Sequence, residues 1–128
     1  MIRLSDLQLD IMQVLWDAGP ATTGDVHQAL EASRGLAYTT VATLLKRLED
    51  KGVISRERDG RQYRYTATVA EPEVRRSMVG SLVDQLFRGD PAALVSHLMG
   101  DEQVSDKDRA RIRQLLDAAE NNDGEERT

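Results

Sequence analysis

The sequence predicts a mainly α-helical protein with a small β hairpin, in which a winged helix-turn-helix domain precedes a C-terminal helical region. Three observations lead to this prediction. Successive amphipathic helical segments occupy the start of the chain, and a basic strand pair with an Asp-Gly turn follows them. Further helical segments fill the rest of the sequence, with no internal repeat and no low-complexity stretch.

Capping patterns mark the first two helices. A capping box at Ser5, followed by apolar residues at helical spacing and a Gly-Pro stop, predicts a helix over residues 6–17. A second box at Thr22 precedes a short apolar face and predicts a helix near residues 23–32. The turn after it contains Gly35, which gives the short Gly-containing connection of a helix-turn-helix.

The third helix, near residues 38–51, has the clearest periodicity. Its apolar residues recur at the spacing of one helical face, at Val41, Leu44, Leu45 and Leu48. The small and polar residues on the rest of its surface are the candidates for contact with DNA. They are Tyr38, Thr39, Thr40, Ala42, Thr43, Lys46 and Arg47.

This outward face has the chemistry of a recognition helix. In a helix-turn-helix module the equivalent helix enters the major groove and turns its N-terminal residues toward the base edges. Threonine hydroxyls bond phosphates or bases, and the threonine methyl packs against a thymine methyl. Lys46 and Arg47 are long enough to reach phosphates. Few of these side chains make bidentate base contacts, so we expect methyl contacts, water and DNA shape to contribute to specificity.

A basic hairpin is predicted over residues 53–66. Two runs of β-forming residues flank Asp59-Gly60, a pair that suits a type I′ turn. Tyr63 and Tyr65 are expected on one face of the second strand. The hairpin arginines are expected along the DNA backbone or in the neighbouring minor groove. These candidates are Arg56, Arg58, Arg61 and Arg64.

The distribution of charge separates the two parts of the chain. The formal net charge is −5, but residues 1–66 hold nine basic and nine acidic side chains. Within them, residues 46–64 hold seven basic and four acidic residues, which makes a local basic stripe. Residues 67–128 hold eight basic and thirteen acidic residues, so this part is expected to lie away from a DNA duplex.

The C-terminal part reads as three further helices, near residues 72–88, near residues 91–99 and from Ser105 onward. Short amphipathic helices of this kind bury too little on their own, so we expect a second chain to cover them, with packing in cis as the alternative. The predicted division is a DNA-binding domain over 1–67, a dimerisation region over 68–120 and a disordered polar tail over 121–128. The expected dimerisation residues are Val74, Met78, Leu82, Leu86, Leu94, Leu98, Ile112, Leu115 and Leu116.

Enzyme, metal and cofactor sites are not expected. The chain has no cysteine, no catalytic triad pattern, no Gly-rich phosphate loop and no zincin motif. His27 and His97 stand alone, and the acidic residues between Asp101 and Asp108 lack the spacing of an EF-hand. The sequence shows no signal peptide and no membrane span, and with the missing cysteines this suggests a cytoplasmic protein.

The stretch GLAYTTVATLLKRLEDKGVISRERDGRQYRY resembles the bacterial penicillinase-repressor family of the BlaI/MecI/CopY type. LQLDIMQVLWDAGPATTGDVHQAL, including Trp16, is similar to the first two helices of that family, and the resemblance extends over residues 4–120. It implies a homodimeric repressor on an inverted-repeat operator, with the C-terminal helices as dimer interface. In the resistance branch it also implies a membrane sensor-protease that relieves repression by leading to cleavage in the C-terminal region.

The sequence departs from the family pattern at two points. The copper-responsive branch uses C-terminal cysteines, which this chain lacks, so copper sensing is not expected. His97-Leu98 stands where the resistance branch has its Asn-Phe cleavage bond. Two alternatives stay open at this point: a winged-helix protein-interaction module that does not bind DNA, and an activator rather than a repressor.

Overall fold

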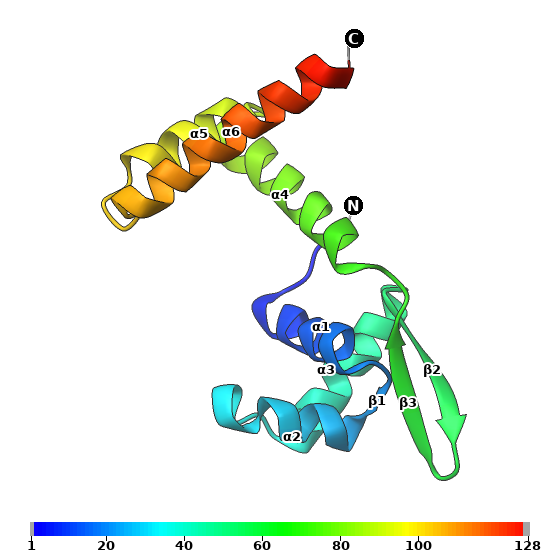
Figure 1. Ribbon diagram of the computed structural model, residues 1–128. Coiled ribbons are helices and arrows are strands. Elements are labelled where there is room, and N and C mark those ends of the chain that lie inside the picture. Colours follow the sequence, from blue (N-terminus) through cyan, green and yellow to red (C-terminus); the bar gives the residue numbers. More distant parts are fainter. Residues whose placement is uncertain (1, 127–128) are drawn as a thin grey trace. The chain divides into compact units, whose positions relative to one another are not determined.

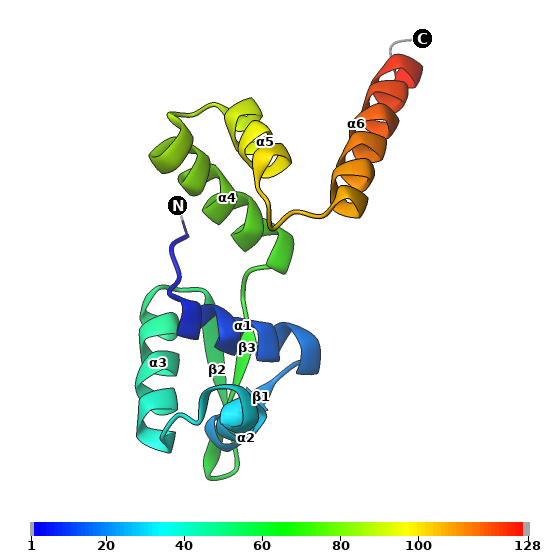
Figure 2. The same cartoon turned by 90° about the vertical axis from the view of Figure 1, so that its left-hand side faces the viewer.

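The computed structural model describes residues 2–126, with side chains described as far as Asn121. The chain divides into two compact units, one ending at Ser81 and the other beginning at Leu82, so α4 contributes to both (Figures 1 and 2). The elements are α1 (Asp6–Ala18), β1 (Ala21–Thr22), α2 (Thr23–Arg34), α3 (Tyr38–Asp50), β2 (Ile54–Asp59), β3 (Gln62–Ala67), α4 (Glu71–Phe87), α5 (Pro91–Gly100) and α6 (Asp106–Glu126).

The predicted capping boxes start α1 and α2. The Ser5 hydroxyl accepts the Gln8 backbone N–H at 3.2 Å, and the Gln8 side-chain oxygen accepts the Ser5 N–H at 3.0 Å. Thr22 and Asp25 make the same reciprocal pair, at 3.1 Å in both directions. These contacts satisfy backbone donors that a helix N-terminus leaves without partners. Gly35 ends α2 in the left-handed region, with φ 58°.

The wing is a three-stranded antiparallel sheet in the order β1-β3-β2. The sequence predicted the hairpin of β2 and β3 but not β1, whose Ala21 lies opposite Tyr65. Asp59 lies opposite Gln62, so the two-residue turn is Gly60-Arg61 and not the expected Asp59-Gly60. Gly60 has φ 62° and Arg61 has no positive φ, which is the pattern of a type II′ turn rather than type I′. Arg61 therefore stands at the tip.

The first unit has a closed apolar core. Residues from all three N-terminal helices, such as Ile11, Val26 and Leu45, are completely buried in it. The first part of α4 joins this core through Val74, which is only 1% exposed. The Trp16 indole N–H also donates to the Val69 carbonyl at 2.9 Å and ties α1 to the segment before α4.

Val74 was expected in the dimer interface, and the structure requires a correction. Its side chain is buried among core residues of its own unit, so it has almost no surface left for a second chain. The Ile2 backbone N–H donates to the Ser77 hydroxyl at 2.7 Å, which further fixes this part of α4 to the first unit. The i+4 pattern of α4 correctly predicted an apolar face but did not show what covers it.

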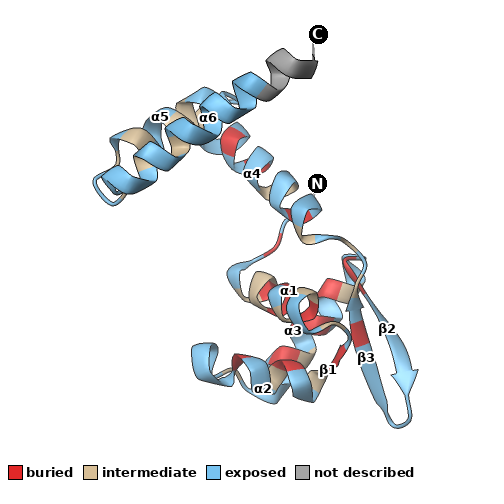
Figure 3. Ribbon diagram, viewed as in Figure 1, coloured by how far each residue is buried: buried red, intermediate tan, exposed pale blue. Residues whose placement is uncertain are grey.

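The second unit consists of the end of α4 and the helices α5 and α6. Arg88 and Gly89, with φ 51° and 81°, end α4, and the Phe87 and His97 rings lie 5.9 Å apart across the turn to α5. Figure 3 shows how little of this unit is buried, and α5 contains no buried residue. Helix α6 continues to Glu126, so the expected tail from residue 121 begins inside this helix, and residues 127–128 lie outside the described part.

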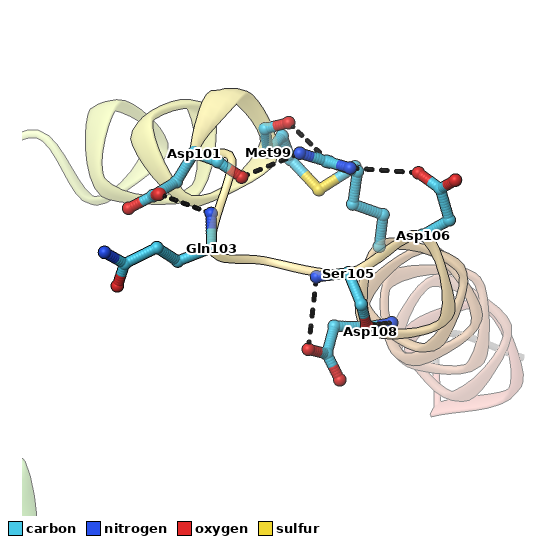
Figure 4. Close-up of polar contacts among 7 residues, drawn as sticks. Met99, Asp101, Gln103, Ser105, Asp106 and Asp108 are labelled. Carbon is cyan, nitrogen blue, oxygen red and sulfur yellow. Dashed lines mark hydrogen bonds and ion pairs between the residues drawn. The ribbon is translucent and has the colours of Figure 1, made fainter.

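Hydrogen bonds hold the corner between α5 and α6 (Figure 4). The Arg109 guanidinium donates to the carbonyls of Met99 at 2.8 Å and Asp101 at 2.7 Å, and to the Asp106 carboxylate at 3.0 Å. Ser105 caps α6 by accepting the Asp108 N–H at 3.1 Å. One arginine thus satisfies carbonyls near the end of α5 that have no partner within the helix.

Across residues 2–126, none of the helices combines the length and the apolar character that crossing a membrane requires.

Candidate nucleic-acid interface

The exposed face of α3 carries the first group of candidate residues. Its buried face holds Val41, Leu45 and Leu48, so the helix is fixed to the core by one side only. All the candidates on α3 are exposed except Ala42, which is half-buried. A shallow hollow on this face contains no acidic residue. It is lined by Thr39, Thr40, Thr43, Leu44 and Arg47.

One contact decides which group Thr43 presents. Its hydroxyl donates to the Thr39 backbone carbonyl of the preceding turn at 3.0 Å. The hydroxyl is therefore occupied by the helix itself, a pattern common for threonine in helices. The methyl group of Thr43 remains as the free contact group, and this is the group that packs against a thymine methyl.

Lys46 and Arg47 differ in their availability. The Lys46 ammonium lies 3.0 Å from the Asp50 carboxylate and 3.9 Å from Glu49. Arg47 makes no side-chain hydrogen bond or ion pair with any residue that the structure describes. An external anion would have to compete with two carboxylates for Lys46 but with none for Arg47, so Arg47 is the more available cation of the pair.

The register of the sheet places the wing arginines on two faces. Arg56 lies opposite Tyr65 and Arg58 lies opposite Tyr63, so both arginines share the face of these tyrosines. The Arg56 guanidinium sits 4.3 Å from the centre of the Tyr63 ring. Arg64 alternates to the other face. The alternation of side chains along the second strand predicted this separation of Arg64 from the tyrosines, and the register confirms it.

Ion pairs occupy two of these arginines. Arg56 lies 3.1 Å from the Glu49 carboxylate, and Arg64 lies 2.6 Å from Asp59, whose hydrogen bond and charge raise the pKa of the Arg64 guanidinium. Arg58 donates to the Gly60 carbonyl at 3.2 Å. Arg61, at the tip, makes no side-chain hydrogen bond or ion pair with any described residue. Arg61 is thus the wing cation most accessible to an external anion.

A second small hollow contains residues that the sequence analysis did not select. Tyr38 and Arg61 were among the predicted DNA-contact residues, but four other lining residues were not: Thr23, Gln62, Tyr63 and Tyr65. The basic pattern of the hairpin does not mark these hydroxyl groups, although the alternation of strand residues places Tyr63 and Tyr65 on one face. Thr23 had no comparable signal, because its position depends on how α2 packs against the sheet.

The two histidines lie in ordinary surroundings. His27 is 3.5 Å from the Glu31 carboxylate, and its ring is 5.8 Å from that of Tyr38. His97 is 4.0 Å from Asp101. In the described part of the chain, no group of three or more histidine, aspartate or glutamate side chains is arranged to hold a metal ion.

The residues expected in the dimer interface differ in exposure. Met78, Leu94 and Ile112 are half-buried, and Val74 is buried. The remaining leucines leave much of their apolar surface in solvent. Their exposed fractions are 40% for Leu82, 70% for Leu86, 36% for Leu98, 60% for Leu115 and 51% for Leu116.

The fold and this surface define a winged-helix protein of the DNA-binding class. Residues 4–118 match the sequence profile of the penicillinase repressor family. The chain therefore belongs to this family of DNA-binding transcriptional repressors, which are regulators and not enzymes.

Similar proteins support the same assignment. The transcriptional regulator BlaI of Mycobacterium tuberculosis is 40% identical over 91 residues, which cover 70% of this chain and 64% of that protein. This chain thus spans slightly less than two thirds of that relative. The penicillinase repressor of Bacillus licheniformis is 24% identical over 119 residues, 93% of each chain. A solution structure of monomeric B. licheniformis BlaI bound to the blaP half-operator covers 56% of this chain and 88% of its own, with 29% identity and a TM-score of 0.50.

Proposed function

We propose that this protein represses transcription in the cytoplasm by binding, as a homodimer, to an inverted-repeat operator. The observation that carries the proposal is the pairing state of its cations. Arg47 on α3 and Arg61 at the wing tip have no carboxylate partner among the described residues, and both line hollows without acidic side chains. Such cations attract phosphates with little competition from the protein itself.

In the proposed complex α3 lies in the major groove and the wing follows the backbone. Thr39, Thr40 and Thr43 face the base edges, with Arg47 at the margin of the groove. BlaI of B. licheniformis, a relative with the same winged helix, has been solved with its half-operator. A half-operator complex is the kind of contact that each winged helix of this protein would make.

Dimerisation is proposed through the exposed leucines of the second unit. A two-fold symmetric protein matches an inverted repeat, and joining two weak DNA-binding domains raises the affinity through effective concentration. The family resemblance and the exposure of Leu86, Leu115 and Leu116 support this role. Val74 is not part of the proposed interface, because its side chain is buried in the core of the first unit.

Derepression is proposed to follow from cleavage or displacement of the C-terminal helices, for example by a sensor-protease. Helix α5 has no buried residue, and the His97 side chain is 63% exposed. Because dimerisation and operator binding are linked, loss of these helices lowers the operator affinity. The missing Asn-Phe bond means that such a protease would have a different sequence preference.

The proposal is tested by fluorescence anisotropy of full-length protein with a duplex from upstream of its own gene. A shuffled duplex is the control, and the salt concentration is varied. We expect tight binding to the upstream duplex alone, with two chains per duplex and a steep loss of affinity as salt increases. Binding to neither duplex at low salt would overturn the proposal and favour the interaction module.

Two variants sharpen this test. Arg61→Glu is expected to abolish operator binding while the protein stays folded, and binding unchanged by it would contradict the role of the wing. A chain truncated after Ser81 keeps Val74 and Ser77, so it retains the described core of the first unit. If the truncated chain still dimerises and binds the operator as tightly as the full chain, the proposed role of the C-terminal helices is wrong.

A further inference from the structure

A small polar hollow lies where the start of α2, the start of α3 and the wing come together. Each of these elements belongs to the first unit of the chain. The hollow is separate from the one on the recognition face of α3, and the two share no lining residue. The hollow is lined by Thr23, Tyr38, Arg61, Gln62, Tyr63 and Tyr65.

The lining combines hydrogen-bond donors with one unpaired cation. The hydroxyl-bearing side chains are Thr23, Tyr38, Tyr63 and Tyr65, and none of these hydroxyls makes a hydrogen bond with another described residue. The Arg61 guanidinium also has no partner among the described residues. No aspartate or glutamate lines the hollow. Several donors, one full positive charge and no competing carboxylate are the composition of an anion site.

The other wing cations lack this combination. Arg56 is held by Glu49 at 3.1 Å, and Arg64 by Asp59 at 2.6 Å. These two charges are paired within the protein, whereas Arg61 has no partner among the described residues and lies beside four hydroxyl groups. We propose that this hollow holds one phosphodiester group of the operator backbone, as a seat separate from the base-reading face of α3.

This inference rests on the proposed function and deepens it. A phosphate held here would touch α2 through Thr23, α3 through Tyr38 and the wing through Arg61. Phosphate contacts carry no sequence information but fix the position of a protein on the duplex. Tyr38 directly precedes Thr39 of the recognition face, so the seat sets the register in which α3 meets the bases.

A coupling experiment with full-length protein tests the seat. Operator duplexes are made with a single neutral methylphosphonate at each backbone position in turn, and affinity is measured for wild type, Tyr38→Phe and Thr23→Val. We expect each variant to weaken binding about 3- to 10-fold on the operator and on shuffled DNA alike. At one backbone position the neutral group should weaken wild type strongly but the variants much less, because the contact is already lost.

Arg61→Ala supplies an independent measurement. Loss of one phosphate contact is expected to reduce the slope of log affinity against log salt by about 0.9. Thr66→Val is the matched control for Thr23→Val, since Thr66 is exposed on β3 and lies on the face away from the tyrosines. We expect this control to leave both the affinity and the methylphosphonate pattern unchanged.

The possible outcomes distinguish failure of the proposed phosphate site from failure of the proposed function, and an operator phosphate from a free one. If wild type binds the operator but no backbone position couples to Tyr38 or Thr23, the proposed phosphate site is wrong and the proposed repressor function still holds. If wild type binds no duplex, the proposed function itself fails. Inorganic phosphate is also titrated at constant ionic strength without DNA. If inorganic phosphate binds tightly and this binding requires Arg61, while no backbone position couples, the hollow holds a phosphorylated small ligand and the proposal of an operator phosphate is wrong.

Discussion

The two units of the chain bury their apolar side chains to very different extents. In the first unit Ile11, Met12 and Leu45 are completely buried, whereas in the second unit Leu86 is 70% and Leu115 60% exposed (Figure 3). Burial of apolar surface is the main stabilising contribution to folding. The first unit therefore holds its own core, while the second leaves much of its apolar surface in solvent.

The comparison predicts its largest effect in the core. We expect Leu45→Ala to lower the free energy of unfolding by about 2–5 kcal/mol, because it leaves a cavity beneath α3. Leu115→Ala is the control, and at concentrations where the chain is monomeric it should change that free energy by less than about 0.5 kcal/mol. Urea denaturation followed by circular dichroism measures both. Equal losses at the two sites would contradict the division into units.

The exposed leucines should instead affect association. We expect the double variant Leu86→Glu, Leu115→Glu to be monomeric in sedimentation equilibrium, because carboxylates would be buried without partners. Its affinity for a full operator should fall by about 100-fold as the avidity is lost, with no change for a half-operator. Gln114→Glu, an exposed change on the same helix, is the matched control and should remain dimeric. A double variant that still forms dimers would show that other residues make the interface.

The sequence predicted the local features of both units well. Capping boxes at Ser5 and Thr22, together with helical periodicity, placed α1 to α5 to within about two residues of their observed bounds, whereas α6 extends into the residues expected as a tail. An Asp-Gly pair between β-forming runs placed the hairpin of β2 and β3. These signals work because caps and tight turns depend on residues that are neighbours in the chain.

Features that depend on distant residues were missed or shifted. Strand β1 is only two residues long and exists through pairing with β3, so it has no periodicity of its own. The sequence identified Val74 as an apolar position on a helix, but it did not indicate that the core of the first unit covers this side chain. The same applies to the arginines, since only the fold brings Glu49 to Arg56 and leaves Arg61 unpaired.

A smaller effect is expected on the surface of the first unit, where we propose that the exposed side chains of α3 contact DNA. Thr43→Ser keeps the hydroxyl bond to Thr39 and removes the methyl, so operator affinity should fall by about 0.8 kcal/mol, roughly 4-fold. Thr43→Val keeps the methyl and should bind nearly as wild type does. Deoxyuridine in place of the contacted thymidine should weaken wild type but not Thr43→Ser. A larger loss for the valine variant would assign the contact to the hydroxyl instead.

The smallest predicted effect concerns the start of α2, which positions the helix-turn-helix within the self-sufficient first unit. A hydrogen bond from the Thr22 backbone N–H, then the Thr22 side chain and the charge of Arg64, hold the pKa of Asp25 below its ordinary value of 3.8. A carboxyl whose pKa is lower in the folded state stabilises the fold fully above its unfolded pKa, and this contribution is lost as the pH falls through the folded pKa. Stability that depends on Asp25 should therefore be present at neutral pH and decline below about pH 4.

Asp25→Asn tests this effect, because the amide still accepts the Thr22 N–H but carries no charge. Thermal unfolding of both proteins is followed between about pH 2 and pH 6, and the difference in melting temperature should shrink as the pH decreases. A difference that stays constant over this range would show that the charge of Asp25 contributes nothing and that the capping hydrogen bonds alone hold the start of α2. Because Asp25 is exposed and solvent screens its charge, we expect Asp25→Asn to change the stability of the fold much less than Leu45→Ala does.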